Sequence, residues 1–117
     1  EKTMANEFKL ITKAGVTSSD VIYTAASGVT AVILGLTLGN TTTSQTTATV
    51  TINTDTANMS GANNEANQAV EIITNAPIPA GSSLSVLDGK IVLATTDEII
   101  VIGSGATDVI LSVMEIT

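Results

Sequence analysis

Few residues of this chain could take part in acid–base or covalent chemistry. Its 117 residues include no His and no Cys, and the four basic residues are all Lys. General acid–base catalysis usually needs a His or two carboxyl groups that converge on one substrate. The only adjacent acidic pair is Asp97 and Glu98, and neighbouring residues of a strand point to opposite faces. We therefore expect no enzyme activity and no catalytic residues, and we expect this pair to form a solvated turn.

Oxygen ligands for a cation occur close together only in residues 55–67. Calcium is held by carboxylate and carbonyl oxygens, but the spacing here matches no EF-hand loop. We expect this stretch to be a mobile or interface loop, with no metal and no cofactor. The run from Gly103 to Gly105 is followed by neither a Lys nor a helix signal, so it predicts a turn and not a phosphate-binding loop. The possible calcium ligands are Asp55, Asn58, Asn63, Asn64 and Glu65.

The charge balance argues against two classes of partner. The formal net charge is −7, from eleven acidic residues and four Lys. Nucleic-acid binding needs cationic side chains near the phosphates, and an acidic protein is repelled by anionic membranes. The two aromatic residues, Phe8 and Tyr23, are also too few to stack bases. The most apolar run, residues 29–39, is much shorter than the ~20 residues of a membrane span. We expect neither nucleic acid nor a membrane as partner.

The composition favours strands over helices. Hydrophobic residues make up 44% of the chain and are mostly Val, Ile, Leu and Ala, with many Thr residues among them. β-Branched residues suit a pleated, half-buried surface. Charged residues make up only 13%, about half of the usual ~25%, so the polar surface is mainly hydroxyl and amide groups. Apolar runs separated by turn residues predict strands at 8–14, 21–24, 30–40, 46–54, 68–75, 84–87, 90–93, 98–102 and 109–116.

Eight or nine short strands in one domain of this size predict an antiparallel β-sandwich. Both jelly-roll and immunoglobulin-like topologies fit the spacing. We expect the domain to span residues 4–117. Residues 1–3 look like a remnant left by cloning in front of a natural start at Met4.

The strongest predicted strand, residues 30–40, is apolar on both faces. Such a strand lies at the centre of a sandwich or is covered by a neighbouring subunit. The next strand, residues 46–54, alternates apolar and polar residues, which predicts one buried and one wet face and a hairpin with its predecessor. Strict alternation puts Val32, Leu34, Leu36 and Leu38 on one face of the first strand, and Ala31, Ile33, Gly35 and Thr37 on the other.

Two turn signals punctuate the second half of the chain. Pro77 and Pro79 lack an amide donor, so they indicate an edge strand or a corner where the chain changes sheets. Asp88 and Gly89 lie between apolar runs, a strong signal for a two-residue hairpin turn with positive φ. On that interpretation, Gly89→Val should destabilise the hairpin.

Four residues are candidates for contacts with other chains. Met59 lies in the polar loop at 55–67, where an apolar side chain has little cover from its own domain. Asn63 and Asn64 share that loop, and Ile78 lies between the two prolines. Met59 could instead fold back onto its own sheet.

The assembled pattern resembles small structural proteins of bacteriophage virions. The resemblance covers nearly the whole chain from Met4, and its motifs recur in several types of virion component. They are Met4-Ala5-Asn6-Glu7-Phe8, Lys13-Ala14-Gly15-Val16, Ile22-Tyr23, Val32-Ile33-Leu34-Gly35-Leu36, Asn40-Thr41-Thr42, Pro79-Ala80-Gly81-Ser82, Leu87-Asp88-Gly89-Lys90-Ile91-Val92-Leu93 and Asp108-Val109-Ile110-Leu111-Ser112-Val113.

The resemblance implies a non-enzymatic β-sandwich that assembles with itself and with other virion proteins. A capsid decoration protein or a head or tail accessory protein is expected, and neck and tail-attachment roles remain open. A homo-oligomer is expected, with a trimer favoured, located in the virion after synthesis in the bacterial cytoplasm. The alternative is a receptor- or carbohydrate-binding module of a tail fibre, in which a calcium site at 55–67 would replace the aromatic side chains that usually bind sugars.

Overall fold

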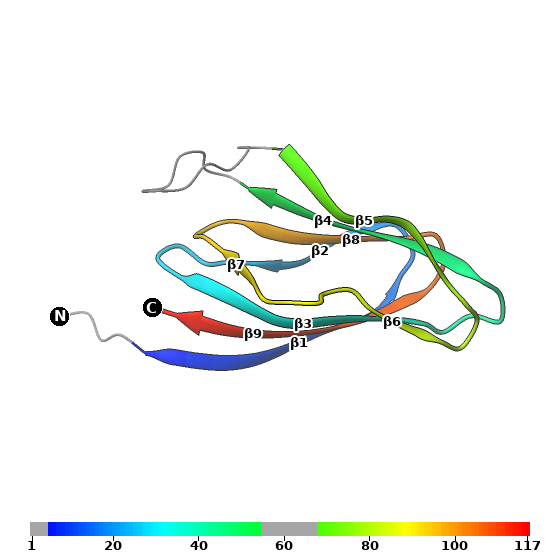
Figure 1. Cartoon of the computed structure of the whole chain (residues 1–117), viewed down its shortest axis with the longest axis horizontal. Coiled ribbons are helices and arrows are strands. Elements are labelled where there is room, and N and C mark those ends of the chain that lie inside the picture. The colour runs from blue at the N-terminus through cyan, green and yellow to red at the C-terminus, as the bar shows by residue number, and fades with distance from the viewer. Residues whose placement is uncertain (1–4, 55–67) are drawn as a thin grey trace.

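The computed structural model describes residues 5–54 and 68–117, which form nine strands and no helix. The strands make two antiparallel sheets, and both sheets run along the long axis of the molecule (Figure 1). All of the predicted strands are present, several of them longer than expected. Their bounds are Asn6–Val16 (β1), Ser19–Thr24 (β2), Thr30–Asn40 (β3), Thr46–Thr54 (β4), Gln68–Ile78 (β5), Ser83–Ser85 (β6), Ile91–Leu93 (β7), Glu98–Gly103 (β8) and Thr107–Ile116 (β9).

The strand order is that of a jelly roll. Sheet A has the order β1-β9-β3, with β6 and β7 both on the far side of β3, and sheet B has the order β2-β8-β4-β5. The chain crosses between the sheets at most of its turns, so the first strand pairs with the last, and strands distant in sequence become neighbours. The predicted β-sandwich is therefore confirmed, and the jelly-roll alternative is the one that the pairing supports.

The core lies between the two sheets and is almost entirely aliphatic. Inward-facing residues of β3 and β9 from sheet A meet those of β4 and β8 from sheet B. Burying each of these side chains contributes roughly 1.5–3 kcal/mol. The largest fully buried side chains are Ile33, Leu36, Leu38, Val50, Ile78, Leu93, Ile99, Val101, Thr107, Val109, Leu111 and Val113.

A β-bulge in β3 overturns the predicted alternation of its faces. The register with β9 shifts between Ile33 and Gly35, so Leu34 is the extra residue. Ile33 faces the core before the bulge and Leu36 faces it after the bulge. The predicted common face was therefore wrong for Val32 and Leu34, which point out of the sandwich. A strict period of two cannot anticipate an inserted residue.

The predicted hairpin between the third and fourth strands was wrong. β3 belongs to sheet A and β4 to sheet B, so residues 41–45 cross between sheets. The predicted wet face of β4 was also wrong in its middle, where Thr49 and Thr51 are buried. β4 lies inside sheet B, between β5 and β8, and the Thr49 hydroxyl oxygen accepts a 2.9 Å hydrogen bond from the Asn75 amide.

The predicted Asp88–Gly89 hairpin was wrong as well. β6 and β7 do not pair with each other, because each pairs with β3, at Thr37–Gly39 and Ala31–Ile33 respectively. They are two halves of one interrupted edge strand, and Val86, directly after β6, still donates a 2.9 Å hydrogen bond to the Leu36 carbonyl of β3. Neither Asp88 nor Gly89 has a positive φ. The reason for expecting Gly89→Val to be harmful is thereby lost.

The two prolines occupy the positions that their chemistry requires. Pro77 lies opposite Thr47 in β5, which is an edge strand of sheet B. At Pro79 the chain turns toward sheet A, and the Pro79 carbonyl accepts a 3.1 Å hydrogen bond from the Ser82 amide. Gly81, inside this turn, has a φ of 68°, which favours glycine. The corner predicted from the prolines is confirmed.

Candidate interaction surface

The described residues, 5–54 and 68–117, offer no cluster of His, Cys, Asp and Glu that could hold a metal ion. The two adjacent carboxylates also have separate tasks. Asp97 is buried and accepts a 3.0 Å hydrogen bond from the Ala94 amide, which closes a turn. Glu98 lies within 3.5 Å of the Thr24 hydroxyl. The expectation of a solvated Asp97 was therefore wrong, because its carboxylate is an internal turn acceptor. Within the same residues, no helix is long and apolar enough to cross a membrane.

Within residues 5–54 and 68–117, the most exposed large apolar side chains lie on the outer face of sheet A, the side turned away from sheet B. The register aligns side chains of this face in rows across the strands. In one row, Phe8 of β1 lies opposite Met114 of β9, which lies opposite Val32 of β3, which lies opposite Val92 of β7. Every residue of this row is apolar, so the row crosses the whole width of the sheet.

The outer face of sheet A is exposed as well as apolar. Phe8 is 72% exposed, Leu10 68%, Val92 63% and Ile110 50%. Side chains of this size normally face the core, and a contiguous exposed set of them usually marks an interaction site. The sequence predicted a strand at 8–14 without assigning its faces, although the alternation of Phe8 and Leu10 with Glu7 and Lys9 is the signal from which this surface could have been found.

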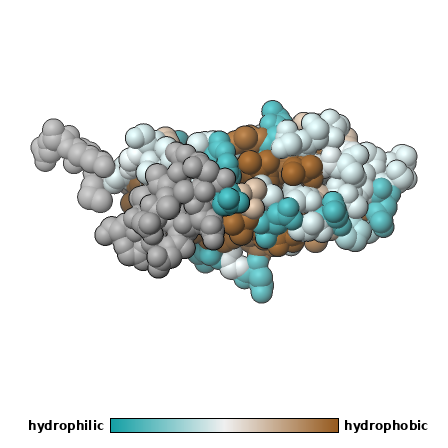
Figure 2. Space-filling view, turned by 90° about the horizontal axis from the view of Figure 1, so that it is seen from above, coloured by the Kyte–Doolittle hydropathy of each residue, from teal (hydrophilic) through white to brown (hydrophobic). Residues whose placement is uncertain are grey.

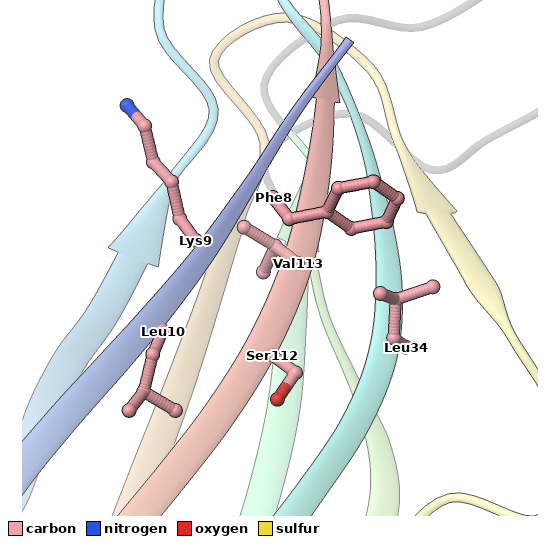
Figure 3. Close-up of a pocket in the computed structure, with 6 residues that line it drawn as sticks. All are labelled: Phe8, Lys9, Leu10, Leu34, Ser112 and Val113. Atoms are coloured by element: carbon pink, nitrogen blue, oxygen red, sulfur yellow. The ribbon is translucent and has the colours of Figure 1, made fainter.

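A shallow groove runs across the outer face of sheet A. Figure 3 shows the Phe8 ring reaching across β9 toward Leu34 of β3, while the Lys9 side chain points away. The bulge in β3 brings Leu34 to this face. The groove is lined by Phe8, Lys9, Leu10, Leu34, Ser112 and Val113.

Sheet B has a smaller apolar exposure. Its exposed large residues are Val21 at 48%, Val70 at 52% and Ile102 at 40%, one on each of three strands. Figure 2, seen from the β4–β5 side, shows hydrophobic residues gathered in the middle of the molecule and paler or hydrophilic residues toward its end. The larger and more exposed apolar side chains belong to sheet A.

The inward side of β1 carries a polar cluster that joins the two sheets. The Lys9 ammonium lies 2.8 Å from Glu115 Oε1, and the Tyr23 hydroxyl donates a 2.5 Å hydrogen bond to Glu115 Oε2. The Lys9 and Tyr23 hydrogen bonds hold the pKa of the Glu115 carboxyl below its usual range, against the opposing effect of burial. Burial and the bond to Glu115 raise the pKa of Tyr23. An inward-pointing Lys on an edge strand also discourages further strand pairing.

The predicted contact residues have different outcomes. Ile78 is fully buried among core residues, so its side chain has no surface to offer another chain, and its proposed contact role does not fit. Its burial follows from the corner, which turns β5 into the core just before Pro79. Met59, Asn63 and Asn64 lie outside the described residues, as do residues 1–3 and the possible calcium ligands.

No protein-family model and no curated protein matches this chain. Solved structures do. A structure of Bacillus endospore appendages, described as disulfide-linked pili, aligns over 100% of this chain and 90% of its own, at a TM-score of 0.52 and 16% identity. Infectious bursal disease virus, Gx strain, aligns over 98% of this chain at a TM-score of 0.55 and 13% identity. The T13 particle of the same virus aligns over 95%, at 0.50 and 11%.

These similarities concern the fold. This chain spans about one third of the length of the two viral chains, 33% and 35% respectively. The pili are described as disulfide-linked, whereas this chain has no Cys and cannot form such links. The chain therefore shares a jelly-roll architecture with proteins of a virus particle and of a pilus.

Proposed function

We propose that this chain is a non-enzymatic structural subunit of a bacteriophage virion, acting as a capsid decoration protein or a head or tail accessory protein. It works by assembling with further copies, with a trimer favoured, and with other virion proteins. The single observation that carries the proposal is the exposed apolar outer face of sheet A, which includes Phe8 at 72% and Leu10 at 68% exposure. A protein that acts alone has little reason to keep such a surface in water.

Two further observations support this proposal. The buried carboxylates of Asp97 and Glu115 serve internal hydrogen bonds, and the described residues hold no cluster of three acidic or metal-ligating side chains. The fold is shared with proteins of a virus particle and of a pilus, both of which are assemblies. The alternative of a carbohydrate-binding fibre module depends on residues 55–67, and no described residue favours it.

The experiment is immunogold electron microscopy of purified virions from the source of the chain, with antibodies raised against the recombinant protein. We expect label at one fixed position of the particle, at the capsid surface or at the junction of head and tail. Label confined to the fibre tips would support the alternative. Particles that carry no label, and contain no such chain by mass spectrometry, would overturn the proposal.

A further inference from the structure

We propose that the outer face of sheet A is the surface through which copies of this chain contact one another in a closed oligomer. This inference rests on the proposed function, because it specifies which partner binds the exposed apolar surface. The occupant is a second copy of the same chain, and the contact is centred on the row formed by Leu10 of β1, Ser112 of β9 and Gly35 of β3.

The charge distribution favours a second copy as the occupant. The chain carries a net charge of −7, so most approaches of two copies are repulsive. The outward-facing strand residues between the row of Asn6 and the row of Thr12 are all uncharged. This face is therefore a place where two copies meet without bringing like charges together. A strongly basic partner would instead be expected to bind a surface that carries carboxylates.

The size of the face suits a stable contact. β1 and β3 have 11 residues each, so at ~3.3 Å per residue the face is about 36 Å long. Four strands about 4.8 Å apart give it a footprint of about 700 Å². A standard protein interface buries about 800 Å² on each partner. The exposed Phe8, Leu10 and Val92 provide the apolar centre that such interfaces require.

The groove supplies shape as well as apolar area. The Phe8 ring reaches across β9 toward Leu34 of β3, and the small Ser112 on β9 leaves room beside these two side chains (Figure 3). A projecting side chain of one copy can enter the groove of the next. In a closed dimer a two-fold axis makes such a contact self-complementary, whereas in a closed trimer one part of the face of each copy meets a different part of the next copy.

The first test places a carboxylate on the face. Leu10→Asp should raise the dissociation constant of the oligomer at least ~100-fold, because an unpaired charge would be buried in the contact. The matched control is Val21→Asp, which introduces the same carboxylate at an exposed apolar residue of β2 in sheet B. Mass is measured by light scattering after size exclusion, and circular dichroism verifies folding. Loss of the oligomer in Leu10→Asp alone supports the inference, and an oligomer that survives Leu10→Asp overturns it.

The second test does not depend on a charged variant that folds. Because the chain has no Cys, Ser112→Cys supplies a single thiol at the centre of the face, with little change in volume. A disulfide forms only when the two Cα atoms come within about 7 Å, and a short bis-maleimide extends that reach. We expect efficient cross-linking of Ser112→Cys and little of the control Val21→Cys. The reverse pattern would overturn the inference.

The two proposals can fail separately. An oligomer that depends on Val21 and not on Leu10 would overturn the sheet A contact and leave the virion role intact. A wild-type chain that is monomeric at every concentration, but labels virions, would overturn self-contact and assign the face to another virion protein. Absence of the chain from virions would overturn the proposed function itself, whatever the oligomer shows.

Discussion

Glu115 illustrates how this chain uses its few charges at the scale of single residues. Its side chain faces the space between the sheets and is only 11% exposed, a costly position for an ion without partners. Lys9 from the neighbouring strand and Tyr23 from the opposite sheet supply those partners. The cluster thus links β1, β9 and β2 at one edge of the sandwich.

The lowered pKa of Glu115 predicts an acid-dependent loss of stability. A carboxyl whose folded pKa is lower than its unfolded pKa stabilises the fold at pH values above the unfolded value of 4.5. That contribution is lost as the pH falls through the lower folded pKa. We expect the free energy of unfolding to decrease as the pH is lowered from about 4.5. In Glu115→Gln this part of the decline should be absent, although the variant is less stable at pH 7. Urea titrations at pH 3 to 7 measure both; an unchanged pH profile in Glu115→Gln would contradict the prediction.

Two glycines with different surroundings predict opposite outcomes for the same substitution. A Cβ on Gly103 would lie 2.8 Å from the Val16 carbonyl oxygen and 2.9 Å from the Thr107 hydroxyl. Overpacking of this kind typically costs about 1–3 kcal/mol, so Gly103→Ala should be destabilised by that amount. Gly89 has no atom within 4 Å of its Cβ position, so Gly89→Ala should change the free energy of unfolding by less than about 0.5 kcal/mol. Thermal and urea unfolding of both variants measure the difference, and equal stabilities would count against the described packing at Gly103.

At the scale of elements, Asn40 joins three segments at the end of β3. Its buried side-chain amide donates 2.8 Å hydrogen bonds to the carbonyl oxygens of Ser44 and Ile78. Its carbonyl oxygen accepts from the Thr42 amide at 2.9 Å. One side chain therefore fixes both the crossing after β3 and the corner after β5.

Removing the Asn40 amide should loosen that junction. Asn40→Ala leaves the buried Ile78 carbonyl without this donor, at a cost of about 1–3 kcal/mol, whereas the Ser44 carbonyl keeps a hydrogen bond from the Thr42 hydroxyl. We expect a loss of about 2 kcal/mol in the free energy of unfolding, measured in urea. Asn6→Ala, at the exposed start of β1, is the control and should be nearly neutral. Equal effects of the two substitutions would show that the junction is held by other contacts.

The sequence predicted the elements better than their partners. The alternation that buries Val109, Leu111 and Val113 identified β9 and its faces, because nothing interrupts its period of two. In β3 the inserted Leu34 shifts the alternation of inward and outward residues by one position. A run of apolar residues does not show where such a bulge occurs. Asp88 and Gly89 have the composition of a hairpin turn, but pairing with β3, a contact distant in sequence, determines where they lie.

The sequence also does not determine which face of β1 turns outward. Phe8 and Leu10 alternate with Glu7 and Lys9, which predicts a strand with one apolar face. That face would ordinarily turn toward the core. In the jelly roll it turns outward, and the inward side of β1 carries Lys9 instead. Orientation is set by the pairing of β1 with β9, which no local pattern encodes.

At the scale of the whole molecule, the residues that stabilise the fold and the exposed apolar residues lie on opposite faces of sheet A. The core between the sheets is complete within one chain, with Ile33, Val50 and Leu111 fully buried. The outer face of sheet A therefore makes no contribution to that core and is available for assembly. The interrupted edge at β6 and β7 and the inward Lys9 of β1 both disfavour open-ended pairing of sheet edges. This arrangement is the one expected of a molecule that associates through a face, as proposed above.

The most direct measurement of the central claim is the solution mass of the wild-type chain by light scattering coupled to size exclusion, over a dilution series. We expect a fixed small multiple of the 11.8 kDa chain mass, with a trimer favoured, that dissociates only on strong dilution. A mass of 11.8 kDa at every concentration would contradict assembly through the outer face of sheet A.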